Sequence, residues 1–87
     1  MKKVLITGAS GGIGTAISEK FLHNDYSLIL TSSSSMKLES LKQKYGANHY
    51  YYILDFSNAE LLKDNLNKIS KDHHDLSVVV NNAGITE

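Results

Sequence analysis

The 87-residue sequence contains no cysteine, no surplus of either charge and no long apolar run. Without cysteine the chain can form neither a disulfide nor a thiolate metal site, as is usual in a reducing cytosol. Nine Lys and Arg residues balance nine Asp and Glu residues, and no basic cluster could neutralise several phosphates in succession. We therefore expect a cytoplasmic protein that does not bind nucleic acid.

The apolar runs are also too short for a targeting or membrane segment. Lys2 and Lys3 precede an apolar run over residues 4–6, but it stops at Thr7, short of the roughly 7–15 apolar residues of a signal peptide. A membrane helix needs roughly 18 apolar residues in succession, and no segment approaches that length. The length suits one small globular domain, and we expect no membrane contact.

The sequence alternates between two periodicities. Short apolar and β-branched runs predict strands at residues 3–7, 27–31, 49–54 and 76–80. Helical spacing between them predicts three helices. One face of the first carries a stripe of Ile13, Ala16, Ile17, Lys20 and Phe21, and the stripes of the other two are Met36, Leu38, Leu41 and Tyr45, and Leu61, Leu62, Leu66 and Ile69. The first helix should end near residues 23–24, Gly46 should close the second with a left-handed cap, and Asn58 should cap the third.

This alternation of four strands with three helices predicts an α/β fold, in the order β-α-β-α-β-α-β. Crossovers of this length join parallel strands and are right-handed, so the helices should cover both faces of one doubly wound sheet. The fourth strand ends close to the last residue, so we expect residues 78–80 to present an unpaired edge. Such an edge favours self-association or pairing with a complementary C-terminal fragment.

A glycine-rich loop, Thr-Gly-Ala-Ser-Gly-Gly-Ile-Gly at residues 7–14, joins the first strand to the first helix. Glycines permit a tight turn, close approach of the backbone to a pyrophosphate, and close packing of helix on strand. The helix N-terminus adds unpaired N–H groups and a positive dipole end. The spacing differs from G-x-G-x-x-G, and the absence of a following Gly-Lys-Ser/Thr argues against a P-loop NTPase. A purely structural turn is the alternative interpretation.

Two motifs in order along the chain resemble the short-chain dehydrogenase/reductase family. They are Thr-Gly-x-x-x-Gly-x-Gly at residues 7–14 and Asn-Asn-Ala-Gly at residues 81–84, after a valine-rich strand. Gly-Ile-Thr at residues 84–86 and the form of the glycine loop are most similar to 3-oxoacyl-acyl-carrier-protein reductases. The resemblance implies the N-terminal half of a Rossmann-type sheet, with residues 1–87 forming a partial dinucleotide-binding domain truncated after its fourth strand.

The resemblance also implies where a cofactor binds. The glycine loop would wrap the pyrophosphate and adenosine ribose, Asp55 would accept a hydrogen bond from the adenine amine, and Asn81 would tie the fourth strand to the sheet. The predicted cofactor-binding residues are Gly8, Ala9, Ser10, Gly11, Gly12, Ile13, Gly14, Ser32, Ser33, Asp55, Phe56, Asn82, Ala83 and Gly84. Taken without the resemblance, Asp55 also fits a helix cap or a turn, and Asn81 and Asn82 fit a loop.

The residues after the second strand decide between NAD and NADP, because an acidic residue there usually binds the ribose 2′-hydroxyl of NAD. Here residues 31–35 are Thr-Ser-Ser-Ser-Ser, and the next acidic residue is Glu39. Hydroxyl groups and the nearby Lys37 accommodate a 2′-phosphate, which favours NADP over NAD. The family's phosphate-binding Arg or Lys in the glycine loop is replaced by Gly11, a departure that weakens this preference.

No residue of this sequence is predicted to be catalytic. The family reduces a carbonyl with a Tyr-x-x-x-Lys pair, a Ser and an Asn, all beyond the Asn-Asn-Ala-Gly strand. None of the five tyrosines here is followed by lysine four positions later. Residues 72–75, Asp-His-His-Asp, are expected to form a solvated connection and no metal site.

The resemblance implies an NADP-dependent oxidoreductase that reduces a carbonyl, with a 3-oxoacyl thioester of fatty-acid synthesis as the favoured substrate. This chain would be its cofactor-binding fragment and inactive alone. The alternatives are a non-catalytic NADP(H)-binding module and a truncated product without function of its own.

Overall fold

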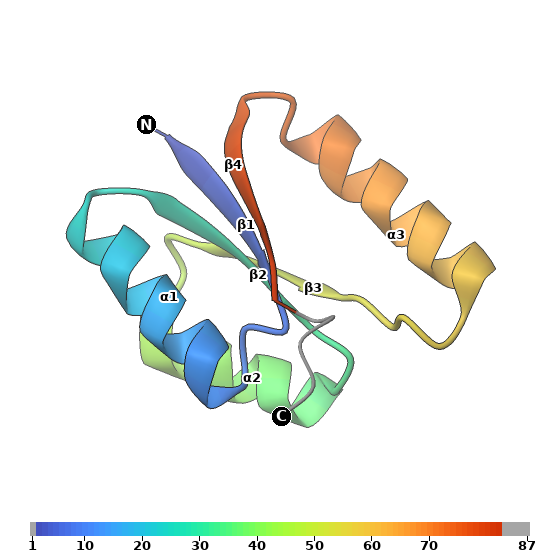
Figure 1. Cartoon of the computed structure of the whole chain (residues 1–87), viewed down its shortest axis with the longest axis horizontal. Coiled ribbons are helices and arrows are strands. Elements are labelled where there is room, and N and C mark those ends of the chain that lie inside the picture. Colours follow the sequence, from blue (N-terminus) through green and yellow to red (C-terminus); the bar gives the residue numbers. More distant parts are fainter. Residues whose placement is uncertain (1, 83–87) are drawn as a thin grey trace.

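The computed structural model describes residues 2–82, which form a four-stranded sheet and three helices (Figure 1). The elements are β1 (Lys3–Thr7), α1 (Gly12–His23), β2 (Ser27–Ser32), α2 (Ser35–Tyr45), β3 (Tyr50–Ile53), α3 (Ala59–Asp72) and β4 (Leu76–Asn81). This confirms the predicted order of strands and helices, and each predicted strand boundary lies within one residue of the observed one. None of the helices within residues 2–82 is long and apolar enough to cross a membrane.

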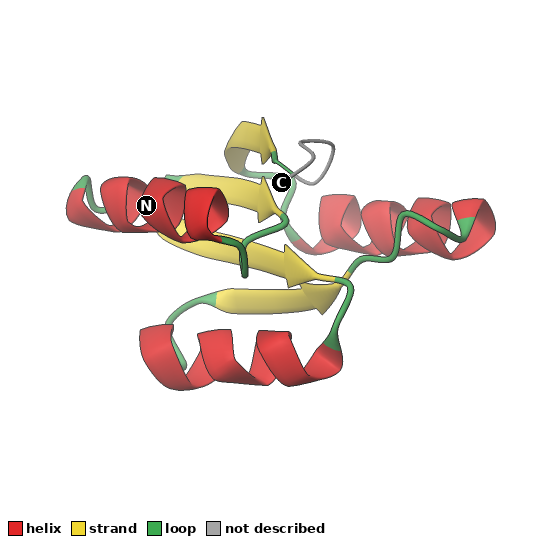
Figure 2. Ribbon diagram, turned by 60° about the horizontal axis from the view of Figure 1, so that its bottom comes forward, coloured by secondary structure: helices red, strands yellow, loops and turns green. Residues whose placement is uncertain are grey.

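All strand pairs are parallel, and the strand order is β3-β2-β1-β4. The chain therefore builds the sheet outward from β1 to β3 and then returns to place β4 on the other side of β1. In Figure 2 the arrowheads point to one side, so the carboxyl ends of the strands share one edge of the sheet. The reversal beside β1 is a topological switch point, where open α/β sheets bind their ligands.

Alternate residues of the strands supply two hydrophobic clusters, one on each face of the sheet. The cluster beneath α1 and α2 contains Val4, Ile6, Ala9, Leu28, Leu30, Leu38 and Leu41. The cluster beneath α3 contains Leu5, Ile29, Leu54 and Ile69. Strands buried on both faces need continuous apolar runs, which explains why β1 and β2 lack the alternating pattern of a half-exposed strand.

The predicted stripe of α1 is only partly correct. Ile17 and Phe21 pack against the larger cluster, whereas three other members of the predicted stripe are exposed: Ile13, Ala16 and Lys20. The positions that are buried in their place are Gly14 and Ser18. Small residues allow the helix backbone to lie close to the sheet, and a search for large apolar residues overlooks them.

The cap of α3 agrees with prediction, and the cap of α2 agrees in part. The Asn58 side chain accepts a hydrogen bond from the Leu61 N–H, 3.1 Å away. Gly46 ends α2 with a positive φ of 85, but its ψ of −170 lies far from the left-handed helical value of about +47. The predicted stripes of both helices agree less well. Met36 is 81% exposed, because it lies two positions from Leu38 and so about 200° around α2. On α3, Ile69 is buried and Leu62 packs beside it, while the two residues flanking that line are exposed: Leu61 and Leu66.

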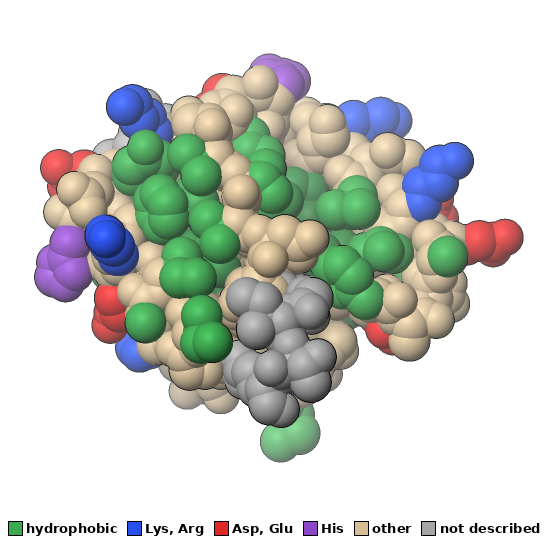
Figure 3. All heavy atoms as spheres, in the orientation of Figure 1, with side chains coloured by type: hydrophobic (Ala, Val, Ile, Leu, Met, Phe, Trp, Pro, Cys, Tyr) green, Lys and Arg blue, Asp and Glu red, His purple; other side chains and the backbone are tan. Residues whose placement is uncertain are grey.

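Within the described residues, β4 forms one end of the sheet and pairs with β1 alone. Val78 and Val80 pack against the larger cluster, whereas Val79 points to the α3 face and is 59% exposed. Figure 3 shows hydrophobic side chains on both sides of the line of β4. Of the three valines predicted to be bare at residues 78–80, only Val79 is exposed.

Candidate functional site

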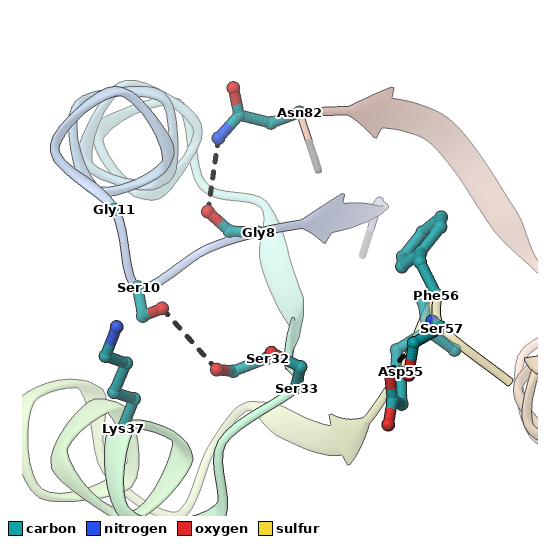
Figure 4. Close-up of a pocket in the computed structure, with 11 residues that line it drawn as sticks. Gly8, Ser10, Gly11, Ser32, Ser33, Lys37, Asp55, Phe56, Ser57 and Asn82 are labelled. Carbon is teal, nitrogen blue, oxygen red and sulfur yellow. Dashed lines mark hydrogen bonds between the residues drawn. The ribbon is translucent and has the colours of Figure 1, made fainter. Parts of the chain in front are cut away.

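An open cleft of about 370 Å³ lies at the carboxyl edge of the sheet, and segments that follow or end all four strands contribute to it (Figure 4). Its lining residues are Gly8, Ser10, Gly11, Ser32, Ser33, Lys37, Leu54, Asp55, Phe56, Ser57 and Asn82. Small-molecule sites commonly span roughly 300–1,000 Å³, so the cleft is large enough to hold a ligand.

The glycine loop after β1 is fixed by close backbone packing. Gly8 has φ 63, a conformation that side chains disfavour, and the Ala9 N–H donates to the Thr31 carbonyl oxygen at 3.0 Å. A Cβ at Gly14 would lie 2.2 Å from the Gly8 carbonyl oxygen and 2.8 Å from Ala9 Cα. Two of the glycines are therefore required for different reasons: Gly8 for its turn, and Gly14 for the contact of α1 with the loop.

The N-terminus of α1 adjoins the cleft at Gly11. No side chain caps this end of the helix, and its first turn contains no acidic residue. The first-turn N–H groups and the positive end of the helix dipole favour an anion at such a position. The cleft thus has an anion-binding feature built from backbone alone.

The wall that follows β2 carries hydroxyl groups and one ammonium group. Ser10 Oγ and Ser32 Oγ are 3.4 Å apart, and Ser32 Oγ accepts a hydrogen bond from the Ser34 N–H at 3.2 Å. Ser34 in turn caps α2 by accepting from the Lys37 N–H at 3.3 Å. The Lys37 side chain points from α2 toward Ser10 (Figure 4). None of the cleft residues contributed by this wall is acidic.

The adjacent wall follows β3, which pairs with β2, and contains the only carboxylate among the described lining residues. Asp55 Oδ1 accepts from the Ser57 hydroxyl at 2.6 Å and from the Ser57 N–H at 2.9 Å. These two bonds, the hydroxyl first, lower the pKa of Asp55 below its ordinary value. Asp55 therefore forms a turn, as one interpretation of the sequence had it, and also faces the cleft. The neighbouring Phe56 ring is half exposed and offers an apolar surface.

Asn82 forms the wall beside β4 and is only 4% exposed. Its Nδ2 donates to the Gly8 carbonyl oxygen at 3.1 Å, and its N–H donates to Thr7 Oγ1 at 3.0 Å. Its Oδ1 is buried and has no hydrogen-bond partner within residues 2–82. Buried acceptors are nearly always satisfied, so a donor supplied by a ligand in the cleft would complete this group.

Asn81 joins β4 to β1, as the resemblance implied. Thr7 Oγ1 donates to Asn81 Oδ1 at 3.1 Å across the pair of strand ends. The same hydroxyl accepts from the Asn82 N–H, so one threonine positions both asparagines.

The cleft gathers eight of the predicted cofactor-binding residues: Gly8, Ser10, Gly11, Ser32, Ser33, Asp55, Phe56 and Asn82. Four others do not line it, and their contact with a cofactor stays a prediction: Ala9, Gly12, Ile13 and Gly14. Ala83 and Gly84 lie outside the described residues. Leu54 and Ser57 line the cleft although the sequence did not predict them, and Lys37, expected near a 2′-phosphate, lines it too. Ser57 was detectable from the Asp-x-Ser spacing that favours an Asx turn.

The prediction of a solvated connection at residues 72–75 is wrong for His73, which is 4% exposed. The Tyr50 and Tyr52 rings pack edge-on against its imidazole, with ring centroids 4.3 and 5.8 Å away. His74 and Asp75 are exposed. In the part of the chain that the structure describes, no three His, Asp or Glu side chains form a group suited to a metal ion.

Comparison with known sequences finds similarity to short chain dehydrogenases. The family model for short chain dehydrogenases matches residues 2–87. The NADP-dependent 3-hydroxy acid dehydrogenase YdfG of Salmonella typhi is 33% identical over 82 residues, which cover 94% of this chain and 33% of that protein. The 3-oxoacyl-[acyl-carrier-protein] reductase FabG of Buchnera aphidicola is 30% identical over 82 residues, covering 94% and 34%. The chain thus spans about a third of the length of these curated relatives.

Solved structures agree with the sequence matches. A short-chain dehydrogenase from Streptomyces avermitilis superimposes with a TM-score of 0.82 at 30% identity, over 98% of this chain and 31% of that one. The serine dehydrogenase from Escherichia coli gives 0.79 at 29% identity, over 100% and 39%. With its glycine loop, parallel sheet and matching relatives, the chain belongs to the short-chain dehydrogenase family.

Proposed function

We propose that the cleft binds a nicotinamide dinucleotide and that it prefers NADP to NAD. The observation that carries the proposal is the convergence of four strand ends on one cavity with an uncapped helix N-terminus. Family membership supports a dinucleotide as the ligand. When bound, the cofactor supplies the hydride of the reaction, and the residues of this chain bind and orient it.

The described residues suit the separate parts of a dinucleotide. The first turn of α1 would bind the pyrophosphate, since its N–H groups meet no capping side chain. The buried Asn82 Oδ1 would accept a hydrogen bond from a ribose hydroxyl and so gain the partner it lacks. Asp55 and the half-exposed ring of Phe56 would contact adenine at the wall that follows β3.

The preference for NADP rests on the wall that follows β2. Ser32, Ser33 and Lys37 line it, and no carboxylate there would repel a 2′-phosphate. The name of the relative YdfG describes an NADP-dependent enzyme, which supports the same preference. Asp55, the one acidic residue among the described lining residues, follows β3, the strand that pairs with β2, and the two bonds it accepts both come from Ser57.

Lys37→Gln tests this preference against Lys42→Gln, the same change of charge on α2 at an exposed residue outside the cleft. By calorimetry, Lys37→Gln should weaken binding of NADPH about tenfold, equivalent to about 1.4 kcal/mol, and leave binding of NADH unchanged. The control should alter neither. Equal losses for both cofactors, or for both variants, would remove Lys37 from phosphate recognition.

We further propose that residues 1–87 act as the partial dinucleotide-binding domain of a cytoplasmic carbonyl reductase, whose favoured substrate is a 3-oxoacyl thioester. The relative FabG, a reductase named for this substrate, supports the assignment. The chain alone should not oxidise NADPH, because it lacks the Tyr-x-x-x-Lys pair. Turnover that persisted through repurification would contradict this.

The outer edge of β4 is the place where a strand from another chain would pair with the sheet. Val79 is exposed there, and within the described residues β4 pairs on one side alone. We propose that a complementary C-terminal fragment, or a second copy of the chain, covers this edge. Sedimentation of the chain with and without such a fragment distinguishes the two, and a monomer unaffected by the fragment would refute both.

A further inference from the structure

Beyond the proposed function, the amino-terminal edge of the sheet contains a hydrogen-bonded chain centred on the buried His73. Its Nδ1 lies 3.2 Å from Lys3 Nζ, and its Nε2 lies 2.8 Å from Tyr52 Oη. A protonated lysine can only donate, so Nδ1 must accept and the ring must carry its proton on Nε2. Nε2–H then donates to Tyr52 Oη, whose own proton goes to Asp72 Oδ2 at 3.0 Å. Neutral His73 thus joins β1, β3 and the end of α3.

A second histidine, on the other face of the sheet, must also accept a hydrogen bond at Nδ1. His49 Nδ1 accepts a hydrogen bond from the Leu28 N–H at 3.0 Å. Leu28 is fully buried, and a backbone amide can only donate. The pairing of β3 with β2 begins one residue later, at Tyr50 with Ile29. His49 therefore supplies the acceptor for a β2 amide just before the backbone of β3 begins to pair.

We propose that these two imidazoles, while neutral, hold the amino-terminal edge of the sheet together through hydrogen bonds, and that acid breaks those bonds. A proton added at Nδ1 of His73 would face the Lys3 ammonium group, and one added at Nδ1 of His49 would face the Leu28 amide proton. Either event breaks a bond that holds two strands or a strand and a helix together. The donors cannot reverse their roles, so the edge loosens when the rings become charged.

The charged groups around His73 shift its pKa in opposite directions. Burial lowers the pKa of His73 most, and Lys3 on β1 lowers it further, whereas Asp72 on α3 and Asp75 before β4 raise it. The net pKa lies below 6.5, partly because Lys3 stays close by donating to Asp75 Oδ1 at 3.1 Å. Tyr50 and Tyr52 of β3 complete the surroundings as neutral rings.

None of the described residues that line the hollow beside His49 is a carboxylate that would raise its pKa. Lys42 of α2 and Tyr51 of β3 border that hollow with Gly46 and Ala47. Burial lowers the pKa of His49 below 6.5. Both histidines therefore favour the neutral form in the folded chain.

The sign of the pH dependence follows from these lowered pKa values. Below pH 6.5 these histidines bind protons more readily in the unfolded chain than in the folded chain. Their contribution to the free energy of unfolding is therefore complete above pH 6.5 and falls as the pH drops toward the folded-state pKa values. Each histidine can raise the unfolding equilibrium constant by at most about tenfold per pH unit in that window, and both together by about a hundredfold. The cofactor cleft lies at the opposite edge of the sheet, so its contacts are not directly altered.

The test compares urea unfolding of the whole chain at pH 7.5, 6.5 and 5.5, at one chain concentration, with His73→Gln, His49→Gln and two controls. Glutamine keeps a hydrogen-bonding side chain that cannot become charged in this range. Each test variant should flatten the pH dependence by up to about tenfold in the unfolding constant per pH unit. The controls His23→Gln and His74→Gln alter exposed histidines and should retain the original slope. Equal slopes in all four variants would overturn the proposal.

Imidazole NMR of the unmodified chain provides a second test, which does not depend on whether the variants fold. At pH 7.5, His73 and His49 should carry their protons on Nε2, with Nδ1 unprotonated. On acidification both should titrate below pH 6.5. A proton on Nδ1 of His73 or His49 at pH 7.5, or titration of both rings at or above pH 6.5, would also overturn the proposal.

Discussion

Gly14→Ala should destabilise the chain, while the same change two residues earlier should not. The new Cβ at position 14 would lie 2.2 Å from the Gly8 carbonyl oxygen, which must retreat by about 1.2 Å to reach the ordinary contact distance of 3.4 Å. All three nearest atoms belong to the backbone of Gly8 and Ala9, so no side chain can rotate away. Overpacking of this kind costs about 1–3 kcal/mol or more, which exceeds the helix propensity of about 0.8–1 kcal/mol that alanine adds.

Gly12→Ala is the matched control, because nothing lies within 4 Å of a Cβ at that position of the same helix. It should leave stability unchanged or raise it by about 0.5–1 kcal/mol. The gain in helix propensity is common to both variants, so they should differ by the overpacking cost of about 1–3 kcal/mol in urea unfolding followed by far-ultraviolet circular dichroism. That is a large fraction of the total stability of a small domain, roughly 5–15 kcal/mol. Equal unfolding midpoints for the two variants would refute the packing argument for Gly14.

Three further changes examine other parts of the structure. Thr7→Val removes the hydroxyl that contacts both Asn81 and Asn82, and should lower the unfolding free energy by about 1–3 kcal/mol in urea. Val79→Lys should raise the solubility limit, since this residue is exposed, whereas Val80→Lys should unfold the chain because Val80 packs against the larger cluster. Burial and the bond to Asp72 raise the pKa of Tyr52 to about 12, so folded stability should fall between pH 10 and 12. Tyr52→Phe should remove that last step from an ultraviolet titration, and its persistence would contradict the contact.

The strands were predictable because two of them are buried on both faces. Residues 4–6 and 28–30 are continuous apolar runs, and all six side chains are buried in the sheet. Alternation with helices implies parallel pairing, but it does not by itself fix which strands become neighbours. The placement of β4 beside β1 depends on contacts such as Thr7 with Asn81, which join residues 74 positions apart.

The wrong predictions concern small and polar residues that are buried, which a hydrophobic pattern does not detect. Gly14 and Ser18 form part of the buried face of α1 because they are small. His73 is buried because Lys3, Tyr50 and Tyr52 are brought to it from distant segments.

Some cleft residues can be recognised from sequence motifs, whereas others reach the cleft only through the fold. Gly8 and Asn82 belong to recognisable motifs, and folding brings them into hydrogen-bond contact. Lys37 belongs to no motif and enters the cleft because Ser34 starts α2 three residues earlier.

The central claim is that the cleft binds a dinucleotide with a preference for NADP, and an amide NMR titration tests it most directly. NADPH should shift the amide signals of Gly8, Gly11, Ser32 and Lys37, which surround the cleft, at lower concentrations than NADH does. Amides at the amino-terminal edge, such as that of Leu28, should remain unchanged. Shifts confined to residues outside the cleft, or identical titrations with the two cofactors, would contradict the account.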